Sequence, residues 1–168
     1  GARTQFLTSS LIVTSRYFIT IITCHFCRHS DYSRRGLEGN HMPHLIIQYS
    51  ESLGERVNMT EFCAVMSKVM QQTGLFPLAG IRVRAHPMPH SSIADEHPEN
   101  AFLDITLRIG EGRSGAQKAA AGSALMEGAK SAFSAQLAHP HFALSLEIIE
   151  ISKSFSWKTN SIHPRLKN

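Results

Sequence analysis

The sequence predicts an α+β fold in which two consecutive strand–helix–strand repeats form one four-stranded sheet with two helices on one face. Two segments carry apolar residues at helical spacing, one over residues 57–73 and one from Ser114 onward. Each is flanked by short alternating segments typical of strands. Because each helix connects two strands, the expected order is β-α-β followed by β-α-β.

The first repeat begins with a short strand that opens at Pro43. A strand accepts proline at its first position, because that residue need not donate a hydrogen bond to the ladder. The helix that follows has a capping pair in Asn58 and Glu61 and a glycine stop at Gly74. The expected elements are a strand over 43–50, a helix over 57–73 and a strand over 81–86.

The second repeat follows a polar, proline-rich loop over residues 87–99. Ser114 and Gln117 form a capping box at the start of a long alanine-rich helix, which His139 and Pro140 end. The expected strands are 101–109 and 143–151. The face of the helix expected to be buried consists of Leu125, Ala129, Ala132, Phe133 and Leu137.

One layer of helices leaves the second face of the sheet open, which predicts self-association. Strands 81–85 and 143–151 carry apolar residues at alternate positions in addition to those expected to face the helices. An apolar face exposed to solvent favours association, so we expect contact between subunits there. The C-terminal segment around Trp157 fits an arm that reaches a neighbouring subunit. The alternative is that it folds back on its own domain.

Composition and charge favour one globular domain that follows a separate leader. The chain has 168 residues, of which 42% are hydrophobic and 18% charged, ordinary values for a domain with one core. Residues 1–42 carry five basic and two acidic residues (+3), and residues 43–168 carry twelve and eleven (+1). The main domain therefore gives no charge argument for nucleic acid. Its lone Cys63 predicts no disulfide, which fits a cytoplasmic location.

The leader over residues 1–42 differs in pattern from the rest. Its apolar stretch is too short and interrupted to span a bilayer, and it lacks the layout of a secretory signal. It contains cysteine and histidine side chains, but a structural zinc site needs a second ligand pair farther along. We expect residues 1–41 to be upstream sequence or an added tail outside the functional protein, with translation starting at Met42. The leader cysteines and histidines considered for such a zinc site are Cys24, His25, Cys27 and His29.

Four features stand in a characteristic order: Pro43 at the head of a strand, GLFPLAGIR over 74–82, IGEGRS over 109–114 and WKTNSIH over 157–163. Together they resemble the 5-carboxymethyl-2-hydroxymuconate Δ-isomerase family of the tautomerase superfamily. The resemblance covers essentially all of residues 43–168 and none of the leader. It implies a homotrimer of two-repeat subunits, with an active site at each amino-terminal proline and no metal or organic cofactor.

The activity implied by this resemblance is an isomerisation in homoprotocatechuate and 4-hydroxyphenylacetate catabolism. A small anionic dienol, 5-carboxymethyl-2-hydroxymuconate, loses its hydroxyl proton and gains a proton on carbon, which gives a 2-oxo acid. The resemblance assigns Pro43 as the base, with Arg82 and Arg113 beside it. Nearby cations lower the pKa of an amine, and guanidinium groups pair with carboxylates in a bidentate way. One of the two arginines would stabilise the enolate oxygen.

The role of Pro43 depends on its covalent state. As an internal residue its nitrogen is an amide without basicity, whereas as a first residue it is a free secondary amine. Removal of Met42 as an initiator methionine would produce that amine. If Pro43 stays blocked, a catalytically silent trimeric binding module is the alternative. Another tautomerase-superfamily reaction, such as hydration, dehalogenation or decarboxylation, also stays open, because the loop over 86–98 diverges from the family pattern.

For the candidate site residues, the sequence also allows roles without any part in catalysis or binding. Arg113 could be a solvated loop residue and Arg82 an outward-facing strand charge, and Arg84 lies on the same face as Arg82 without a role in the family. His44 is interpreted as structural. The loop histidines lack metal-ligand spacing and are interpreted as solvated: His86, His90 and His97.

Overall fold

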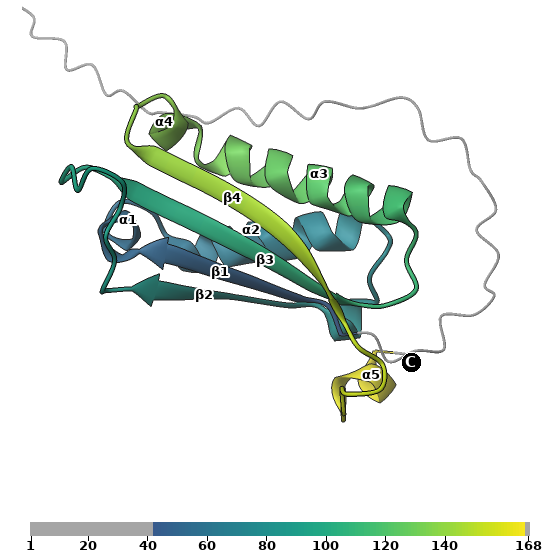
Figure 1. Ribbon diagram of the computed structural model, residues 1–168. Helices are drawn as coiled ribbons and strands as arrows, with labels where there is room; N and C mark the ends of the chain where they lie inside the picture. The colour runs from purple at the N-terminus through teal and green to yellow at the C-terminus, as the bar shows by residue number, and fades with distance from the viewer. Residues whose placement is uncertain (1–41, 167–168) are drawn as a thin grey trace, which may run out of the picture. The chain divides into compact units, whose positions relative to one another are not determined.

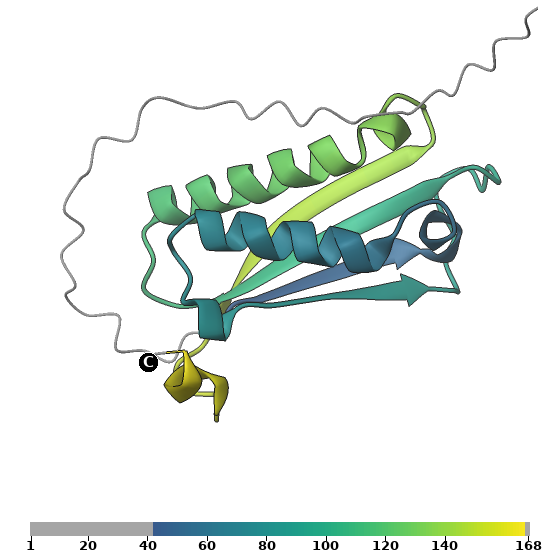
Figure 2. The same ribbon diagram turned by 180° about the vertical axis from the view of Figure 1, so that it is seen from behind.

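The computed structural model describes residues 42–166, which contain a four-stranded sheet covered on one face by two long helices (Figures 1 and 2). The strands are β1 (His44–Ser50), β2 (Arg82–Met88), β3 (Ala101–Gly110) and β4 (Phe142–Ile151). The long helices are α2 (Met59–Gln72) and α3 (Gly115–Ala132). Shorter helical turns are α1 (Glu51–Gly54), η1 (Leu78–Gly80), α4 (Ser134–Leu137) and α5 (Ile162–Arg165).

The strand order β2-β1-β3-β4 confirms the two-repeat prediction. β1 pairs with β2 in parallel, β3 pairs with β4 in parallel, and the two repeats meet where β1 and β3 run antiparallel. Figure 2 shows α2 and α3 side by side across one face of the sheet, and Figure 1 shows the opposite face uncovered. Residues 1–41 of the predicted leader, which include its cysteines and histidines, lie outside the described residues, which begin at Met42.

Both long helices begin where the sequence predicts. The Asn58 side chain accepts a hydrogen bond from the Glu61 N–H at 3.1 Å. At α3, the Ser114 hydroxyl accepts from the Gln117 N–H at 3.2 Å, and the Gln117 side chain accepts from the Ser114 N–H at 2.9 Å. These contacts satisfy N–H groups that have no partner within the helix. Gly74 has a φ of 66°, a left-handed conformation that favours glycine just after a helix.

The core lies between the sheet and the two long helices. The sheet contributes Leu45, Ile47, Leu103, Ile105, Leu107 and Ile109. The helices and the residue that follows α3 contribute Phe62, Met66, Met70, Ala121, Leu125, Ala129 and Phe133. Alternate strand residues and every third or fourth helix residue are therefore buried, as the two periodicities require.

The predicted burial of Ala132 and Leu137 is wrong, since both are exposed. The regular helix stops at Ala132, and Phe133 takes φ −108° and ψ 25° before the chain continues in α4. The fully buried Phe133 ring packs edge-on against Phe62 and stacks on Phe142. The break changes the direction of the chain, so the 3.6-residue spacing that would place Leu137 on the core face does not continue through it.

The open face of the sheet is more polar than the sequence suggests. β2 turns Val83 and Ala85 toward the helices, so Arg82 and Arg84 lie on the open face. The expectation of apolar open-face residues is therefore wrong for β2, although Ile149 of β4 fulfils it with 42% of its surface exposed. Burial of this face in an assembly would have to satisfy charged groups as well as apolar ones.

Across residues 42–166, no helix is both long enough and apolar enough to cross a membrane.

Candidate active site

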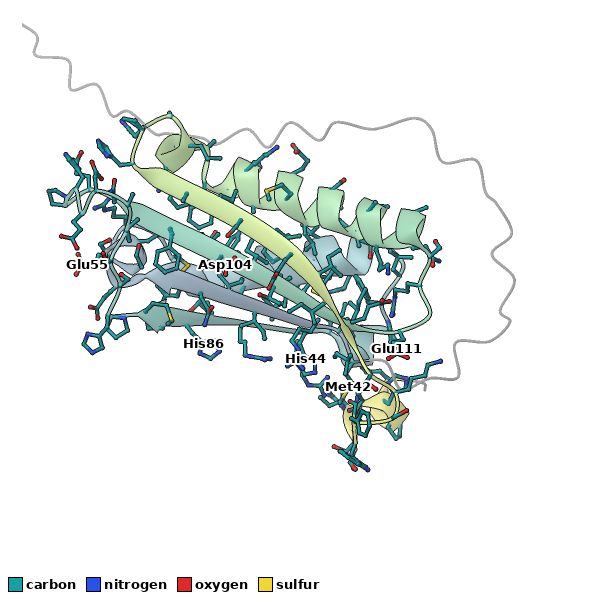
Figure 3. The ribbon with its side chains drawn as sticks, viewed as in Figure 1. Met42, His44, Glu55, His86, Asp104 and Glu111 are labelled. Carbon is teal, nitrogen blue, oxygen red and sulfur yellow. The ribbon has the colours of Figure 1, made fainter. Side chains whose placement is uncertain are left out.

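The three predicted site residues, Pro43, Arg82 and Arg113, lie at one end of the sheet. His44 pairs with Arg82 on β2 and with Arg108 on β3, so Pro43 sits where β2 begins and β3 ends. Arg113 follows three residues after Gly110, the last residue of β3. Figure 3 shows Met42, His44 and Glu111 at this end and Glu55 at the opposite one.

Pro43 is fully buried and joined to its neighbours through the backbone. Its carbonyl oxygen accepts a hydrogen bond from the Arg82 N–H at 3.1 Å, which ties the head of β1 to the first residue of β2. In the 168-residue chain its nitrogen is bonded to Met42, so this nitrogen is an amide and has no basicity. The full chain therefore holds proline in the predicted position without the amine that a base requires.

Arg82 is a half-buried residue, and its guanidinium is held by the turn that precedes its own strand. Its Nη1 donates to the Gly80 carbonyl at 2.9 Å, and Gly80 is the buried end of η1. Arginine carries five N–H donors. The contact with Gly80 fixes the side chain and uses one donor, so the other donors stay available to bind an anion. This arrangement differs from the freely solvated strand charge that was the alternative.

Arg113 is likewise half-buried and anchored. Its two terminal nitrogens donate to the carbonyls of Gly110 at 3.0 Å and Leu75 at 3.3 Å. Its guanidinium carbon lies 5.2 Å from the centre of the Phe76 ring, within range of a cation–π interaction. Burial lowers the pKa of Arg113, and the Glu150 carboxylate opposes that shift. A guanidinium nevertheless stays protonated in a protein.

Arg113 is therefore an ordered cation and not a solvated loop residue. Sequence reasoning did not assign a role to Phe76 or to the Leu75 carbonyl, although both belong to the run over 74–82 that carries the family resemblance. These two groups bring the turn after α2 into contact with the loop after β3.

Arg84 and His44 form a further contact beside the site on the open face. The Arg84 Nη1 lies 3.2 Å from the His44 Nδ1. Burial lowers the pKa of His44, and so do the positive charges of Arg84, Arg82, Arg108 and Lys158, in that order. Because neutral imidazole accepts the arginine N–H, the pair is consistent with an uncharged His44 surrounded by cations. The end of the sheet next to Pro43 is therefore strongly electropositive.

Comparison with known proteins places these features in a family. The family model described as "CHMI: 5-carboxymethyl-2-hydroxymuconate isomerase" matches residues 43–166. A curated relative from Escherichia coli, 5-carboxymethyl-2-hydroxymuconate Delta-isomerase, is 36% identical over 126 residues, which make up 75% of this chain and 100% of the relative.

Solved structures show the same similarity. A 5-carboxymethyl-2-hydroxymuconate isomerase from Deinococcus radiodurans R1 is 35% identical with a TM-score of 0.73, and the match covers 79% of this chain and 100% of that one. A structure of a 5-carboxymethyl-2-hydroxymuconate delta-isomerase is 28% identical with a TM-score of 0.70, covering 76% and 94%. A structure named "W0 fused 4-OT wild type symmetric trimer" is 23% identical with a TM-score of 0.50, covering 65% and 87%, and shares the fold.

The electropositive surroundings of His44 give a pH-dependent prediction. Arg84→Ala removes one cation, so the pKa of His44 should rise toward its ordinary value of 6.5. Because the pKa in the folded protein lies below 6.5, the unfolded chain binds the proton more readily. This residue therefore lowers the free energy of unfolding as the pH falls from about 6.5 through the folded-state pKa. In Arg84→Ala, this pH-dependent loss of unfolding free energy should be smaller.

An NMR titration of the His44 ring measures this pKa directly. Arg56→Ala is the matched control, since Arg56 is an exposed arginine next to α1, at the opposite end of the sheet. An identical His44 pKa in the parent and in Arg84→Ala contradicts the electrostatic interpretation.

Proposed function

The chain belongs to the 5-carboxymethyl-2-hydroxymuconate isomerase family, and on that premise we propose that it isomerises 5-carboxymethyl-2-hydroxymuconate, with Pro43 as the base. The observation that carries this proposal is that Pro43 and two anchored arginines, Arg82 and Arg113, lie at the same end of the sheet. A small polyanion fits such a site, because its carboxylates pair with guanidinium groups.

The proposed reaction moves one proton and one double bond. The free nitrogen of Pro43 takes the proton from the dienol hydroxyl, and the electron pair of the broken O–H bond forms the 2-oxo group. The double bonds shift along the carbon chain, and the proton is delivered to carbon from the proline nitrogen. The product has the same atoms and electrons as the substrate, so no oxidant or reductant is required.

The positive charges around Pro43 suit both the base and the substrate. A protonated amine that is buried next to guanidinium groups is disfavoured, so the neutral, proton-accepting form gains population near neutral pH. The same guanidinium groups stabilise the negative charge that develops on the enolate oxygen. Anchoring of Arg82 by Gly80 and of Arg113 by Gly110 and Leu75 holds these donors in place before substrate binds.

The active form of the protein is proposed to begin at Pro43. The family match starts at this residue. The Escherichia coli relative is covered over its whole length by 126 aligned residues, which make up only 75% of this chain. A chain translated from Met42 would expose the proline nitrogen once that methionine is removed.

The active protein is further proposed to be a homotrimer. Support comes from the uncovered sheet face, from the side chains of Phe155 and Trp157, which are 79% and 86% exposed, and from the 4-OT protein of this fold that is named a trimer. Large exposed aromatic residues are common in contacts between subunits.

Sedimentation equilibrium tests the trimer. The expected mass is three times that of one chain, and Trp157→Ala should shift the equilibrium toward smaller species. A monomer at micromolar concentrations of the parent protein contradicts the assembly.

Chain length gives the sharpest activity prediction. A protein that starts at Pro43 should isomerise the dienol, and the 168-residue chain should be slower by about 10²–10⁴, the usual contribution of a positioned base. The measurement is the ultraviolet absorbance change of the dienol. The matched control starts with one added glycine before Pro43, which restores the amide and should be as slow as the full chain. Equal rates for all three proteins contradict proline catalysis.

The arginines can be tested in the protein that starts at Pro43. Arg82→Ala and Arg113→Ala should each lower kcat/KM by about 10²–10³, because each removes a charged donor from the transition state. Lys130→Ala is the control, since Lys130 is an exposed cation of α3 that pairs with Glu127. Thermal unfolding of each variant separates lost chemistry from lost structure. An unchanged rate for either arginine variant removes that residue from the mechanism.

A further inference from the structure

We propose that the end of the sheet opposite Pro43 carries a binding site for a divalent transition-metal ion, with His97, Glu99 and His141 as ligands. One imidazole nitrogen from each histidine and one oxygen of the carboxylate lie within 4.8 Å of one another. Such grouping of two imidazoles and a carboxylate is typical of metal sites.

The sheet brings these ligands together although they lie far apart in the sequence. His97 and Glu99 belong to the loop that leads into β3, and His141 immediately precedes β4. Ala101 pairs with Phe142 at the start of the β3–β4 ladder, and the Ala101 N–H donates to the His141 carbonyl at 2.9 Å. The ten-residue β3 places this site roughly 30 Å from the loop that holds Arg113. The site is therefore separate from the proposed active site.

The Asn100 side chain anchors the loop before β3 and determines which ring nitrogen of His141 carries the hydrogen. Its side-chain NH₂ donates to the Ile93 carbonyl at 3.0 Å and to the Asp95 carboxylate at 2.8 Å. Its oxygen lies 3.2 Å from the His141 Nδ1, and an amide oxygen can only accept. His141 must then donate from Nδ1, which leaves a lone pair on Nε2 when the ring is neutral. A ligand histidine in a protein is usually held by the same kind of contact.

The distances already approach those of a metal site. The His141 Nε2 lies 3.5 Å from a Glu99 oxygen. Metal–ligand bonds of about 2.0–2.2 Å in a tetrahedron place neighbouring ligand atoms about 3.3–3.6 Å apart. The rings of His97 and His141 stack with centroids 4.2 Å apart and planes 9° apart, so His97 has to turn for its lone pair to reach the ion. His97 is exposed, and turning gives up one hydrogen bond, from the Glu99 N–H at 3.3 Å.

The adjacent cavity supplies room for a remaining ligand. A cavity of about 330 Å³ is lined by Glu99, His141 and Gln136, among others. The Gln136 Oε1 is buried and has no hydrogen-bond partner among the described residues. A water bound to the metal would be a donor for such an oxygen. Arg56 lines the same cavity and opposes a cation, but it is exposed, so solvent and salt weaken its effect.

The ligand types define the class of metal. Imidazole nitrogens suit Zn²⁺, Ni²⁺ and Cu²⁺, whereas Mg²⁺ and Ca²⁺ prefer oxygen ligands in greater number. Three protein ligands leave at least one position for water. Such an ion would cross-link the loop before β3 to the start of β4, and binding to the folded state alone would stabilise the protein.

Titration calorimetry with Zn²⁺ tests this site in the full chain, in a background with Cys24→Ser and Cys27→Ser so that the leader thiols do not bind zinc. We expect one Zn²⁺ whose affinity falls by at least about tenfold in His97→Ala and in His141→Ala. His90→Ala is the matched control, because His90 belongs to the same loop outside the cluster and should leave the affinity unchanged. Zinc should also raise the Tm of the parent and of His90→Ala, and raise that of the two ligand variants less.

Electron paramagnetic resonance of the Cu²⁺ form gives a second readout of the nitrogen ligands. His97 is an exposed loop residue, so His97→Ala keeps the test meaningful even if His141→Ala unfolds. Zinc binding of equal affinity in the parent and in His97→Ala, or no binding by the parent at all, overturns the proposal.

Discussion

The parallel pairing of β1 with β2 is the constraint on which the rest of the structure depends. It sets Pro43 against the first residue of β2, with the Arg82 N–H bound to the Pro43 carbonyl. The antiparallel pairing of β1 with β3 then fixes where the loop that carries Arg113 begins. A shift of one residue in either register would turn Arg82 toward the helices and Val83 away from them, so the apolar core and the candidate active site are specified together.

The positive charge at the Pro43 end of the sheet has two effects. Burial and the surrounding cations lower the pKa of His44, and the same field would act on a free amine at Pro43. It would also attract an anionic substrate. Crowded like charges cost stability, and here part of that cost is offset by anchoring. Arg82 and Arg113 bind backbone carbonyls, Arg113 stacks over Phe76, and Arg84 contacts an imidazole.

Local signals in the sequence predicted most of the fold. The features that these signals did not reveal depend on contacts between residues far apart in the chain. Helix starts at Asn58 and Ser114 follow from capping chemistry within three residues. The break at Phe133 depends on aromatic partners from other elements, so helical periodicity could not reveal it. Spacing along the chain could not reveal that His97 and His141 stack, because they are 44 residues apart and come together only through the β3–β4 ladder. Arg82 and Arg113 were predicted as site residues from family motifs, since charge and periodicity alone could not distinguish them from solvated residues.

The central claim is that a free nitrogen at Pro43 is less basic than an ordinary amino terminus. A ¹⁵N NMR titration of the protein that starts at Pro43, labelled at proline, measures that pKa directly. Burial and the neighbouring guanidinium groups should place it below the ordinary α-amino range of about 7.7–8.0. A pKa within or above that range would show that the arginines do not tune the proline, and would contradict the account.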